Sequence, residues 1–393
     1  MGMLILFLLS VSYNAIFSFG DSISDTGNLC TGSGGCPPYG NTHFGHPTGR
    51  CTDGRVVVDF LAEHFGLPLL PPSKASGGDF KKGANMVIIG ATTMDFEFFN
   101  IWNNGALGTQ IQWFQQLMPS ICGSDCKTYL NSSLFVVGEF GGNDYNAPLF
   151  GGKNVHGRGQ NLRAPDHRQD HEQQGQIIDL IVTVNYYLQA LIELGATELV
   201  VPGVLPIGCF PLYLTLYPSS NKDDYDEIGC LKSFNNLSGY HNNLLKRAVS
   251  GLQSKHAGVR LMYADFYAQV VDMVRSPETF ASFSDMLDPS QWGFHGHTQQ
   301  NGLHLAGMPM PSLFDGARQQ PDAMNPWLKY GLRERQGSYN YNNRAWCGMS
   351  GSSACGDPEK HLDWDGIHLT DAAYHAVADG WLNGTYCSPG ILH

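Results

Sequence analysis

The chain has 393 residues, of which 42% are hydrophobic and 11% aromatic, and this composition excludes an intrinsically disordered protein. Its net charge is −12, with 23 basic residues against 35 acidic ones and no run of Lys or Arg. This balance argues against a protein that binds nucleic acid and against one that docks on an anionic membrane surface.

The N-terminal residues 1–12 form an apolar lead-in to the rest of the chain. Residues 3–11 resemble the apolar core of a secretion signal, although no basic residues precede them. We expect a shortened signal segment or, alternatively, an extra buried segment, because the run is too short to span a bilayer. Residues 13–388 are expected to form one domain, since large α/β folds often reach this length.

Residues 15–19 form an apolar run of strand type that breaks at Gly20, and Ser22 is the first residue with nucleophile chemistry after the break. In an open α/β sheet, ligands bind just past the carboxyl ends of the strands. A serine there sits in a tight turn close to unpaired backbone N–H groups, as a nucleophilic serine requires. A helix cap or a turn at Ser22 or Ser24 is the alternative, since serine favours both.

Apolar runs of strand and helix type alternate along the rest of the chain. Strands are expected at 85–89, 134–137, 198–202 and 259–265. Helices are expected at 56–65, 108–118, 177–194, 234–252, 266–274 and 369–382. This alternation predicts an α/β protein with right-handed βαβ units and a parallel sheet. The turns after Phe19, Ile89 and Val137 carry Gly with Ser, Thr or Asn, and we expect them at one edge of that sheet.

Two stretches, 153–176 and 282–337, lack this apolar periodicity. The first is polar and charged, and the second scatters Trp, His, Met and Pro without a period. Long irregular stretches are unusual inside a compact domain. We therefore expect loops or poorly ordered insertions at both places.

Ten cysteines and three glycosylation sequons give information on the cellular compartment of the protein. Three cysteine pairs are close in sequence: Cys30 and Cys36, Cys122 and Cys126, and Cys347 and Cys355. None is a C-x-x-C motif, which disfavours zinc and thioredoxin-type sites. The sequons begin at Asn131, Asn236 and Asn383. Together with the close cysteine pairs, they favour an oxidising, secretory setting.

Among the fifteen histidines, His368 alone has an acidic residue three positions before it, Asp365. This spacing by itself is weak evidence. However, Asp365-Gly366 is a turn signal, and an amphipathic helix is expected to follow. At such a junction the carboxylate could hold the imidazole in one tautomer and stabilise its charged form. A surface histidine near a helix start is the alternative.

Acyl transfer also needs donors for the oxyanion. The backbone N–H groups of Ser22 and Gly90 and the side-chain amide of Asn143 are candidates, because each follows a predicted strand and glycine allows close backbone approach. A tight turn at Gly90 and an Asx turn at Asn143 are the alternatives.

Four blocks in this order resemble the plant GDSL esterase/lipase family of the SGNH hydrolase superfamily. The blocks are 19–28 (FGDSISDTGN), 83–92, 141–144 (GGND) and 365–368 (DGIH). The resemblance runs from about residue 13 to 387, without the two irregular stretches. It implies a three-layer α/β/α fold with a single mostly parallel sheet, of flavodoxin-like type.

The resemblance also implies roles for individual residues. Ser22 would be the nucleophile, His368 the base and Asp365 its orienter, with oxyanion donors at Ser22, Gly90 and Asn143. It implies a secreted, glycosylated enzyme that acts on small-molecule esters with no cofactor and no metal. The oligomeric state stays open.

The chain departs from the family pattern at three places. The first block has Ile23 where Leu is usual, Ile89 replaces a frequent glycine, and the stretches 153–176 and 282–337 are atypical. The leading interpretation is a secreted serine esterase, and the alternative is a catalytically impaired ester- or glycan-binding protein with the same fold. A lipase of the α/β-hydrolase type is disfavoured because no G-x-S-x-G occurs, and a metal hydrolase because no H-E-x-x-H occurs.

Overall fold

The computed structural model describes residues 11–29, 39–95, 105–150, 170–280, 339, 341 and 358–393. Its centre is a six-stranded sheet with the order β2-β1-β3-β4-β5-β6. The strands are β1 (Ile16–Phe19), β2 (Gly83–Asn85), β3 (Leu134–Val137), β4 (Glu198–Pro202), β5 (Arg260–Ala264) and β6 (Cys387–Ser388). The first five strands are parallel, and only β6 runs antiparallel, against β5. The predicted single, mostly parallel sheet is therefore confirmed.

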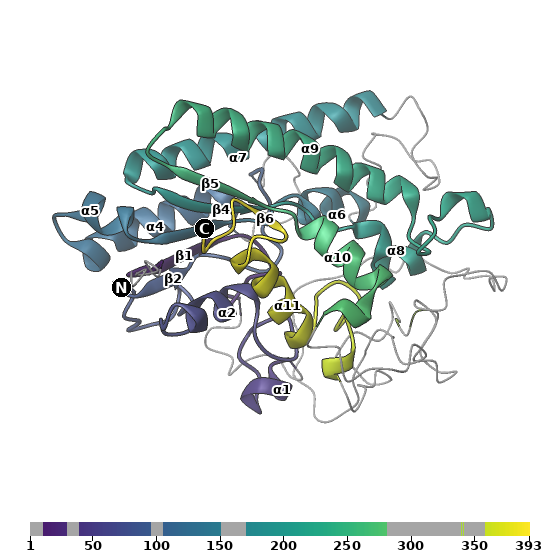
Figure 1. Ribbon diagram of the computed structural model, residues 1–393, viewed down its shortest axis with the longest axis horizontal. Helices are drawn as coiled ribbons and strands as arrows, with labels where there is room; N and C mark the ends of the chain where they lie inside the picture. The colour runs from purple at the N-terminus through teal and green to yellow at the C-terminus, as the bar shows by residue number, and fades with distance from the viewer. Residues whose placement is uncertain are drawn as a thin grey trace, which may run out of the picture.

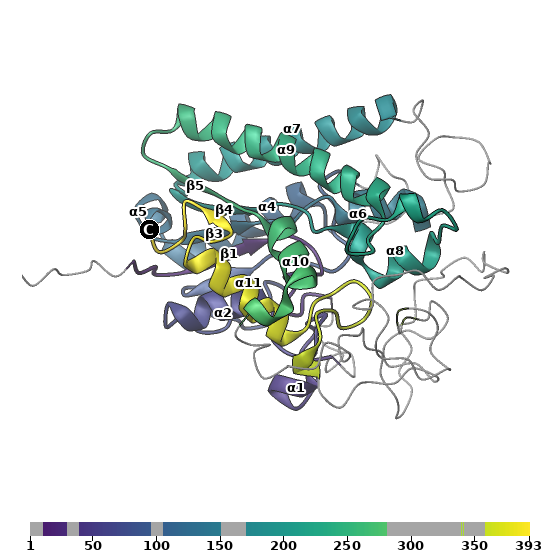
Figure 2. The same cartoon turned by 45° about the vertical axis from the view of Figure 1, so that its right-hand side comes forward.

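Helices cover both faces of the sheet (Figures 1 and 2). On one face lie α4 (Leu107–Cys122), α5 (Cys126–Asn131), α7 (Asp170–Leu194) and α9 (Lys232–Lys255). On the other face lie α2 (Val57–His64), α10 (Phe266–Arg275) and α11 (Asp371–Leu382). Three further helices are α1 (Asn41–Phe44), α6 (Gly142–Phe150) and α8 (Pro211–Leu216). This is the predicted three-layer α/β/α arrangement.

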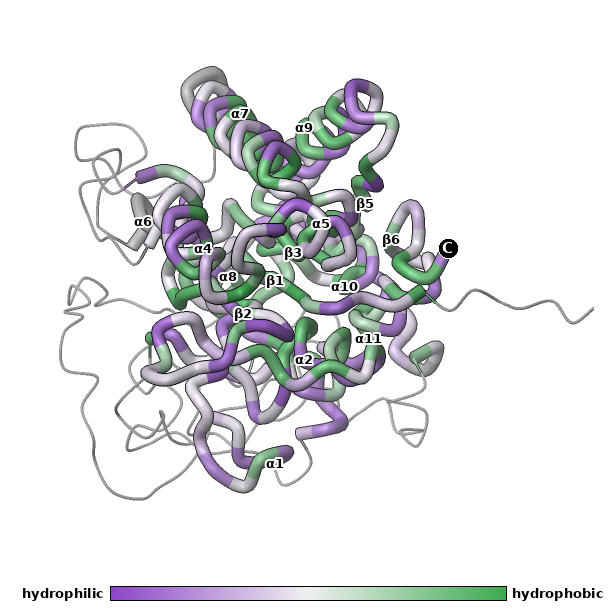
Figure 3. The backbone as a smooth tube through the Cα atoms, turned by 90° about the vertical axis from the view of Figure 1, so that its left-hand side faces the viewer, coloured by the Kyte–Doolittle hydropathy of each residue, from purple (hydrophilic) through white to green (hydrophobic). Residues whose placement is uncertain are grey.

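Side-chain alternation in the strands explains the two layers. Successive side chains of a strand point to opposite faces of the sheet. In β1, Ile16 packs with the α2 and α11 layer, whereas Phe17 and Phe19 pack with α4, α7 and α9. Every residue of β1 and β3 is buried, and in Figure 3 these strands lie between α7 and α9 on one side and α2 and α11 on the other. Apolar burial on both faces is what a central parallel strand requires.

The strand order creates a switch point between β1 and β3. The chain passes from β1 to β2 on one side and then returns past β1 to β3 on the other. The loops that follow these two strands therefore diverge and leave room between them, which is where open α/β sheets bind ligands. Ser22 follows β1 and Asn143 follows β3, so the order places both candidates at the switch point.

Strand β2 is shorter than predicted and lies earlier in the chain. The expected strand 85–89 is wrong beyond Asn85, because side chains bind the backbone there. Asn28 donates to the carbonyls of Asn85 and Val87 (both 2.7 Å), and the Asn85 side chain accepts from Val87 N–H (2.9 Å). Residues 86–89 therefore form a loop rather than a strand, with residues 86–88 buried and Ile89 half-buried.

The other predicted elements agree with the structure to within a few residues, with one exception. Helix α7 begins at Asp170, so the expectation of an irregular stretch is wrong for residues 170–176. The rest of that stretch and residues 282–337 lie outside the described residues, as do residues 1–10. Within α7, Gln174–Leu194 is long and apolar enough to cross a membrane by length and composition. Leu188 and Leu191 of this helix are buried against the sheet layer, whereas Ile178, Val182 and Tyr186 are exposed, and 33% of the apolar window is buried.

Two disulfides lie in the described part of the chain. Cys122–Cys126 joins one of the close pairs, and Cys209–Cys230 joins the turn after β4 to the segment before α9. The other close pairs lie outside the described residues. The three sequon asparagines, Asn131, Asn236 and Asn383, are all exposed.

Candidate active site

Ser22 lies in a tight loop directly after β1. The loop is closed locally: Ser24 N–H donates to the Asp21 carbonyl (3.0 Å), and Asp25 accepts from the N–H groups of Gly27 and Asn28 (2.7 and 2.8 Å). Gly20 is required at the entry, because a Cβ there would lie 2.8 Å from the carbonyl oxygen of Gly138. The turn leaves Ser22 only 8% exposed and fixes its position at the sheet edge.

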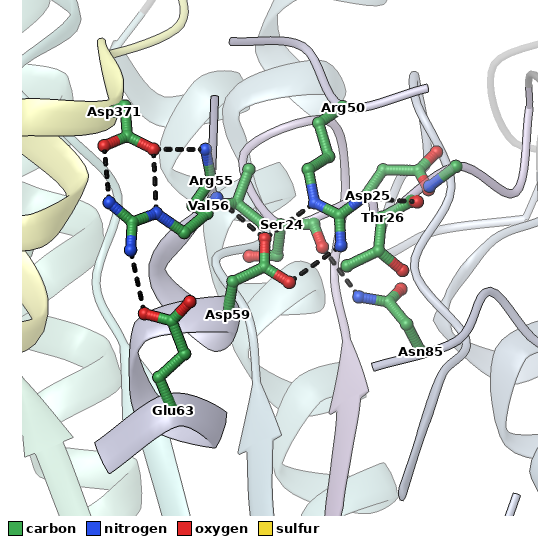
Figure 4. Close-up of polar contacts among 11 residues, drawn as sticks. Ser24, Asp25, Thr26, Arg50, Arg55, Val56, Asp59, Glu63, Asn85 and Asp371 are labelled. Carbon is green, nitrogen blue, oxygen red and sulfur yellow. Dashed lines mark hydrogen bonds and ion pairs between the residues drawn. The ribbon is translucent and has the colours of Figure 1, made fainter. Parts of the chain in front are cut away.

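A buried ion pair supports this loop from behind (Figure 4). Arg50 binds both carboxylate oxygens of Asp59 (2.6 and 2.8 Å), and it also donates to the Thr26 carbonyl. Asp59 accepts in addition from Val56 N–H at the start of α2 (3.0 Å). From the other side, the Asn85 amide donates to the Ser24 carbonyl (2.7 Å). The serine loop is thus joined to α2 and β2 by buried hydrogen bonds.

We expect Arg50→Ala to lower the free energy of unfolding by about 3–5 kcal/mol, because Asp59 would stay buried without its partner. Urea unfolding followed by circular dichroism measures this change. Arg275→Ala is the matched control: its ion pair with Glu227 is exposed, so a loss of less than about 1 kcal/mol is expected. Equal losses in the free energy of unfolding would show that the buried Arg50–Asp59 pair stabilises the fold no more than the exposed pair does.

Asp365 and His368 lie on a short loop that the bridge Asp363–Leu369 closes, just before helix α11. The His368 carbonyl accepts from Trp364 N–H (2.6 Å), which closes the loop, and Thr370 caps α11 through Ala373 N–H. This geometry turns both side chains toward the serine loop. His368 Nε2 lies 2.7 Å from Ser22 Oγ, and His368 Nδ1 lies 2.7 Å from Asp365 Oδ2.

The structure thus brings together three side chains that were singled out in the sequence. They form one line of hydrogen bonds, although Ser22 and His368 are 346 residues apart. All three residues are largely shielded from water. The arrangement can pass the serine proton to the imidazole and balance the resulting charge on the carboxylate.

Electrostatics favours a charged imidazole in this arrangement. Burial opposes the charge of His368, but the ion pair and hydrogen bond with Asp365 outweigh it and raise the pKa of His368 above its ordinary value. Burial likewise opposes the charge of Asp365, yet His368 and the phenol of Tyr39 hold the pKa of this carboxyl below its ordinary value. Tyr39 donates to Asp365 Oδ2 (2.7 Å), the same oxygen that faces His368.

A second set of contacts joins the histidine loop to the serine side of the site (Figure 4). Arg55 donates to both oxygens of Asp371 at the start of α11, through its backbone and its guanidinium. Asp371 N–H donates in turn to Asp53 (2.8 Å). The segment before α2 and the start of α11 therefore form one frame, which fixes the distance between Ser22 and His368.

Asn143 lies in the first turn of α6 and links the other candidates. Its Nδ2 donates to Asp21 Oδ2 (2.7 Å) and to the carbonyl of Ala91 (3.0 Å). These two partners are the neighbours of Ser22 and Gly90, so one amide group connects the three sequence-predicted oxyanion donors. Gly90 has φ +78°, a conformation that favours glycine. The Asx-turn alternative for Asn143 does not apply, because its side chain crosses to other loops.

Two further residues, Gln110 and Asp144, support the site but were not among the candidates proposed from the sequence. Gln110 of α4 binds both backbone groups of Gly20 (2.9 and 2.8 Å), and Asp144 accepts from the N–H groups of Thr93 and Met94. Gln110 lies inside a predicted helix, and the sequence does not distinguish a single buried polar residue there from the exposed polar residues of the same helix. Only Asp144, next to Asn143 in the third block, could have been found from its position.

The comparisons with known proteins point to one group. The family model described as GDSL-like Lipase/Acylhydrolase matches residues 16–381. The chain is 35% identical to the GDSL esterase/lipase At1g28600 of Arabidopsis thaliana, over 96% of this chain and 86% of that protein. It is 36% identical to the GDSL esterase/lipase At5g45910 of the same plant, over 97% of this chain and 93% of that protein.

Proposed function

Because the chain belongs to the GDSL-like lipase/acylhydrolase family, we propose that it is a secreted serine esterase that hydrolyses small carboxylic esters through an acyl-enzyme on Ser22. Membership of this family confirms the resemblance inferred from the four sequence blocks, and it makes the chain a carboxylic ester hydrolase. One observation carries the serine mechanism: the line of 2.7 Å hydrogen bonds from Ser22 through His368 to Asp365.

The steps of the reaction follow from the hydrogen bonds that join Ser22, His368 and Asp365. Ser22 Oγ attacks the ester carbonyl while His368 Nε2 takes its proton. The imidazolium then gives this proton to the leaving alcohol, and the acyl group stays on Ser22. Water, activated by His368, attacks the acyl-enzyme and releases the acid. Asp365 holds the tautomer that leaves Nε2 free to accept a proton, and it stabilises the imidazolium.

The oxyanion would lie between Ser22, Gly90 and Asn143. Both Nδ2 hydrogens of Asn143 are engaged, one by Asp21 and one by the Ala91 carbonyl. We expect the substrate oxygen to replace the Ala91 carbonyl, whose hydrogen bond is the longer of the two. The negative charge that develops on that oxygen makes it the stronger acceptor.

We expect Asn143→Ala to lower kcat about 10²–10³-fold, because one oxyanion donor is lost. Hydrolysis of p-nitrophenyl butyrate measures this change. Asn221→Ala is a control on an exposed loop, and it should leave the rate unchanged. A kcat within threefold of the wild type in Asn143→Ala would remove this amide from the oxyanion site.

Secretion is supported by two features of the structure. The disulfides Cys122–Cys126 and Cys209–Cys230 are typical of proteins from oxidising compartments. The sequon residues Asn131, Asn236 and Asn383 are exposed, as N-glycosylation requires. We therefore expect glycans at these sites in the secreted protein.

Hydrolysis of short p-nitrophenyl esters by the full chain tests the proposed function. Activity is expected in the wild type and absent in Ser22→Ala. Ser24→Ala is the matched control, because Ser24 lies on the same loop but His368 contacts Ser22. Full activity in Ser22→Ala, or none in a folded wild type, would contradict the proposal.

A further inference from the structure

Two buried carboxyl groups lie next to the proposed site and take no direct part in the making and breaking of bonds described above. Asp21 precedes Ser22, and Glu139 follows β3. The two residues are 2% and 4% exposed, and a hydrogen bond between their side chains lowers the pKa of Asp21 and raises the pKa of Glu139. Since two ionised carboxylates cannot form that bond, one of the two groups must carry a proton.

The proton belongs on Glu139. Glu139 accepts one backbone N–H, from Gly142, but its Oε2 is buried and has no N–H or O–H donor among the described residues, so as a carboxylate this oxygen would be left unsatisfied. Asp21, in contrast, accepts from Ile23 N–H (3.1 Å) and Asn143 Nδ2 (2.7 Å), bonds that stabilise an ionised carboxylate. Burial and the nearby charge of Asp21 raise the pKa of Glu139 well above its ordinary value.

Other ionisable groups face this pair from the surrounding elements. His368 favours the charge of Asp21, whereas Asp25 opposes it. Asp144 lies near both carboxyls and is itself held by the N–H groups of Thr93 and Met94. A neutral Glu139 therefore reduces the negative charge in a region that already holds three buried aspartates.

The state of Asp21 decides how the Asn143 amide is oriented. An amide can present either its NH₂ group or its oxygen, and the hydrogen-bond partners select one. An ionised Asp21 only accepts, so it binds the NH₂ group. A protonated Asp21 could instead donate to the amide oxygen, and the amide could then turn its oxygen toward the developing oxyanion.

We propose that Glu139 is a positioning residue for ester hydrolysis: as a neutral acid it donates to Asp21, and the Asp21 carboxylate holds the Asn143 amide nitrogen toward the reacting centre. This inference rests on the proposed function. Two residues of the segment Glu139–Asp144 then have a role: Asn143 binds the oxyanion, and Glu139 orients Asn143 through Asp21.

Two substitutions separate hydrogen bonding from packing. Glu139→Gln keeps the shape and a side-chain donor, and we expect kcat within about threefold of the wild type. Glu139→Leu keeps an apolar side chain of similar size but loses the donor, and we expect kcat to fall at least tenfold with KM within twofold. Equal loss in Glu139→Gln and Glu139→Leu would overturn the proposal.

The double variant shows whether the effect passes through Asn143. If Glu139 acts by orienting this amide, Glu139→Leu should have less than a twofold further effect on kcat in Asn143→Ala. A full tenfold loss in that background would contradict the proposal. Asp21→Asn, which is isosteric, gives a second measurement if Glu139→Leu fails to fold: kcat should fall at least tenfold, and an unchanged kcat would overturn the inference.

The controls keep this inference distinct from the proposed function. If Ser22→Ala retains the wild-type turnover, the serine mechanism itself fails. If turnover depends on Ser22 but kcat does not respond to Glu139→Leu, only the positioning role fails. Thermal unfolding of each variant shows whether the fold is kept.

Discussion

Turnover of a short-chain ester by His368→Ala is expected to fall by about 10⁶-fold, because the variant loses the only base that contacts Ser22 in the described structure. Without the imidazole, the serine proton has no acceptor at 2.7 Å, and the leaving alcohol has no acid. Release of p-nitrophenol from p-nitrophenyl butyrate at saturating substrate measures the change.

The matched control is His375→Ala, seven residues further along the chain. His375 lies on α11, is half exposed and stacks on Phe60, so its loss should leave kcat nearly unchanged. A His368→Ala variant that keeps more than a tenth of the wild-type kcat would show that another group is the base.

Asp365→Asn is expected to lower kcat by about 10⁴-fold with the fold intact. The amide can donate to His368 Nδ1, which selects the wrong tautomer and protonates the nitrogen that faces Ser22. The variant also loses the ion pair that raises the pKa of His368, so that burial, which lowers this pKa, dominates. Since the reaction needs a neutral imidazole, the pH at half-maximal rate should move to lower values.

The pH profile gives this prediction a second readout. Both kcat and the midpoint of its rise with pH are measured for the wild type, Asp365→Asn and the exposed-surface control Asp379→Asn on α11. An unchanged midpoint in Asp365→Asn would show that this carboxylate does not set the basicity of His368. A kcat within tenfold of the wild type would show that it does not orient the ring.

Much of the fold could be predicted from hydrophobic periodicity. Strands β1, β3 and β4 are short apolar runs between turn residues, and each was located to within one residue. Strand β2 could not be placed in the same way, because Asn28 and Asn85 bind the backbone of the apolar residues 86–89. Side-chain bonds from a distant loop leave no trace in local periodicity.

The candidate site also contains residues that the sequence indicated and residues that it did not. Ser22, Asp365, His368 and Asn143 stand in short motifs and could be proposed from the sequence. Their partners could not: Arg50 reaches Asp59 because both are enclosed behind the serine loop, and Glu139 meets Asp21 because β1 and β3 are neighbours. The contact between Glu139 and Asp21 depends on strand order, which the sequence pattern did not specify, and the Arg50–Asp59 pair depends on the burial of two charged residues, which the pattern did not indicate.

Covalent labelling tests whether Ser22 is a nucleophile that His368 activates. The full chain is treated with a fluorophosphonate, and intact mass and peptide mapping locate the adduct. We expect one adduct, on Ser22, that is absent in Ser22→Ala and forms far more slowly in His368→Ala. An active wild-type enzyme that stays unlabelled, or that carries its adduct on another residue, would contradict it.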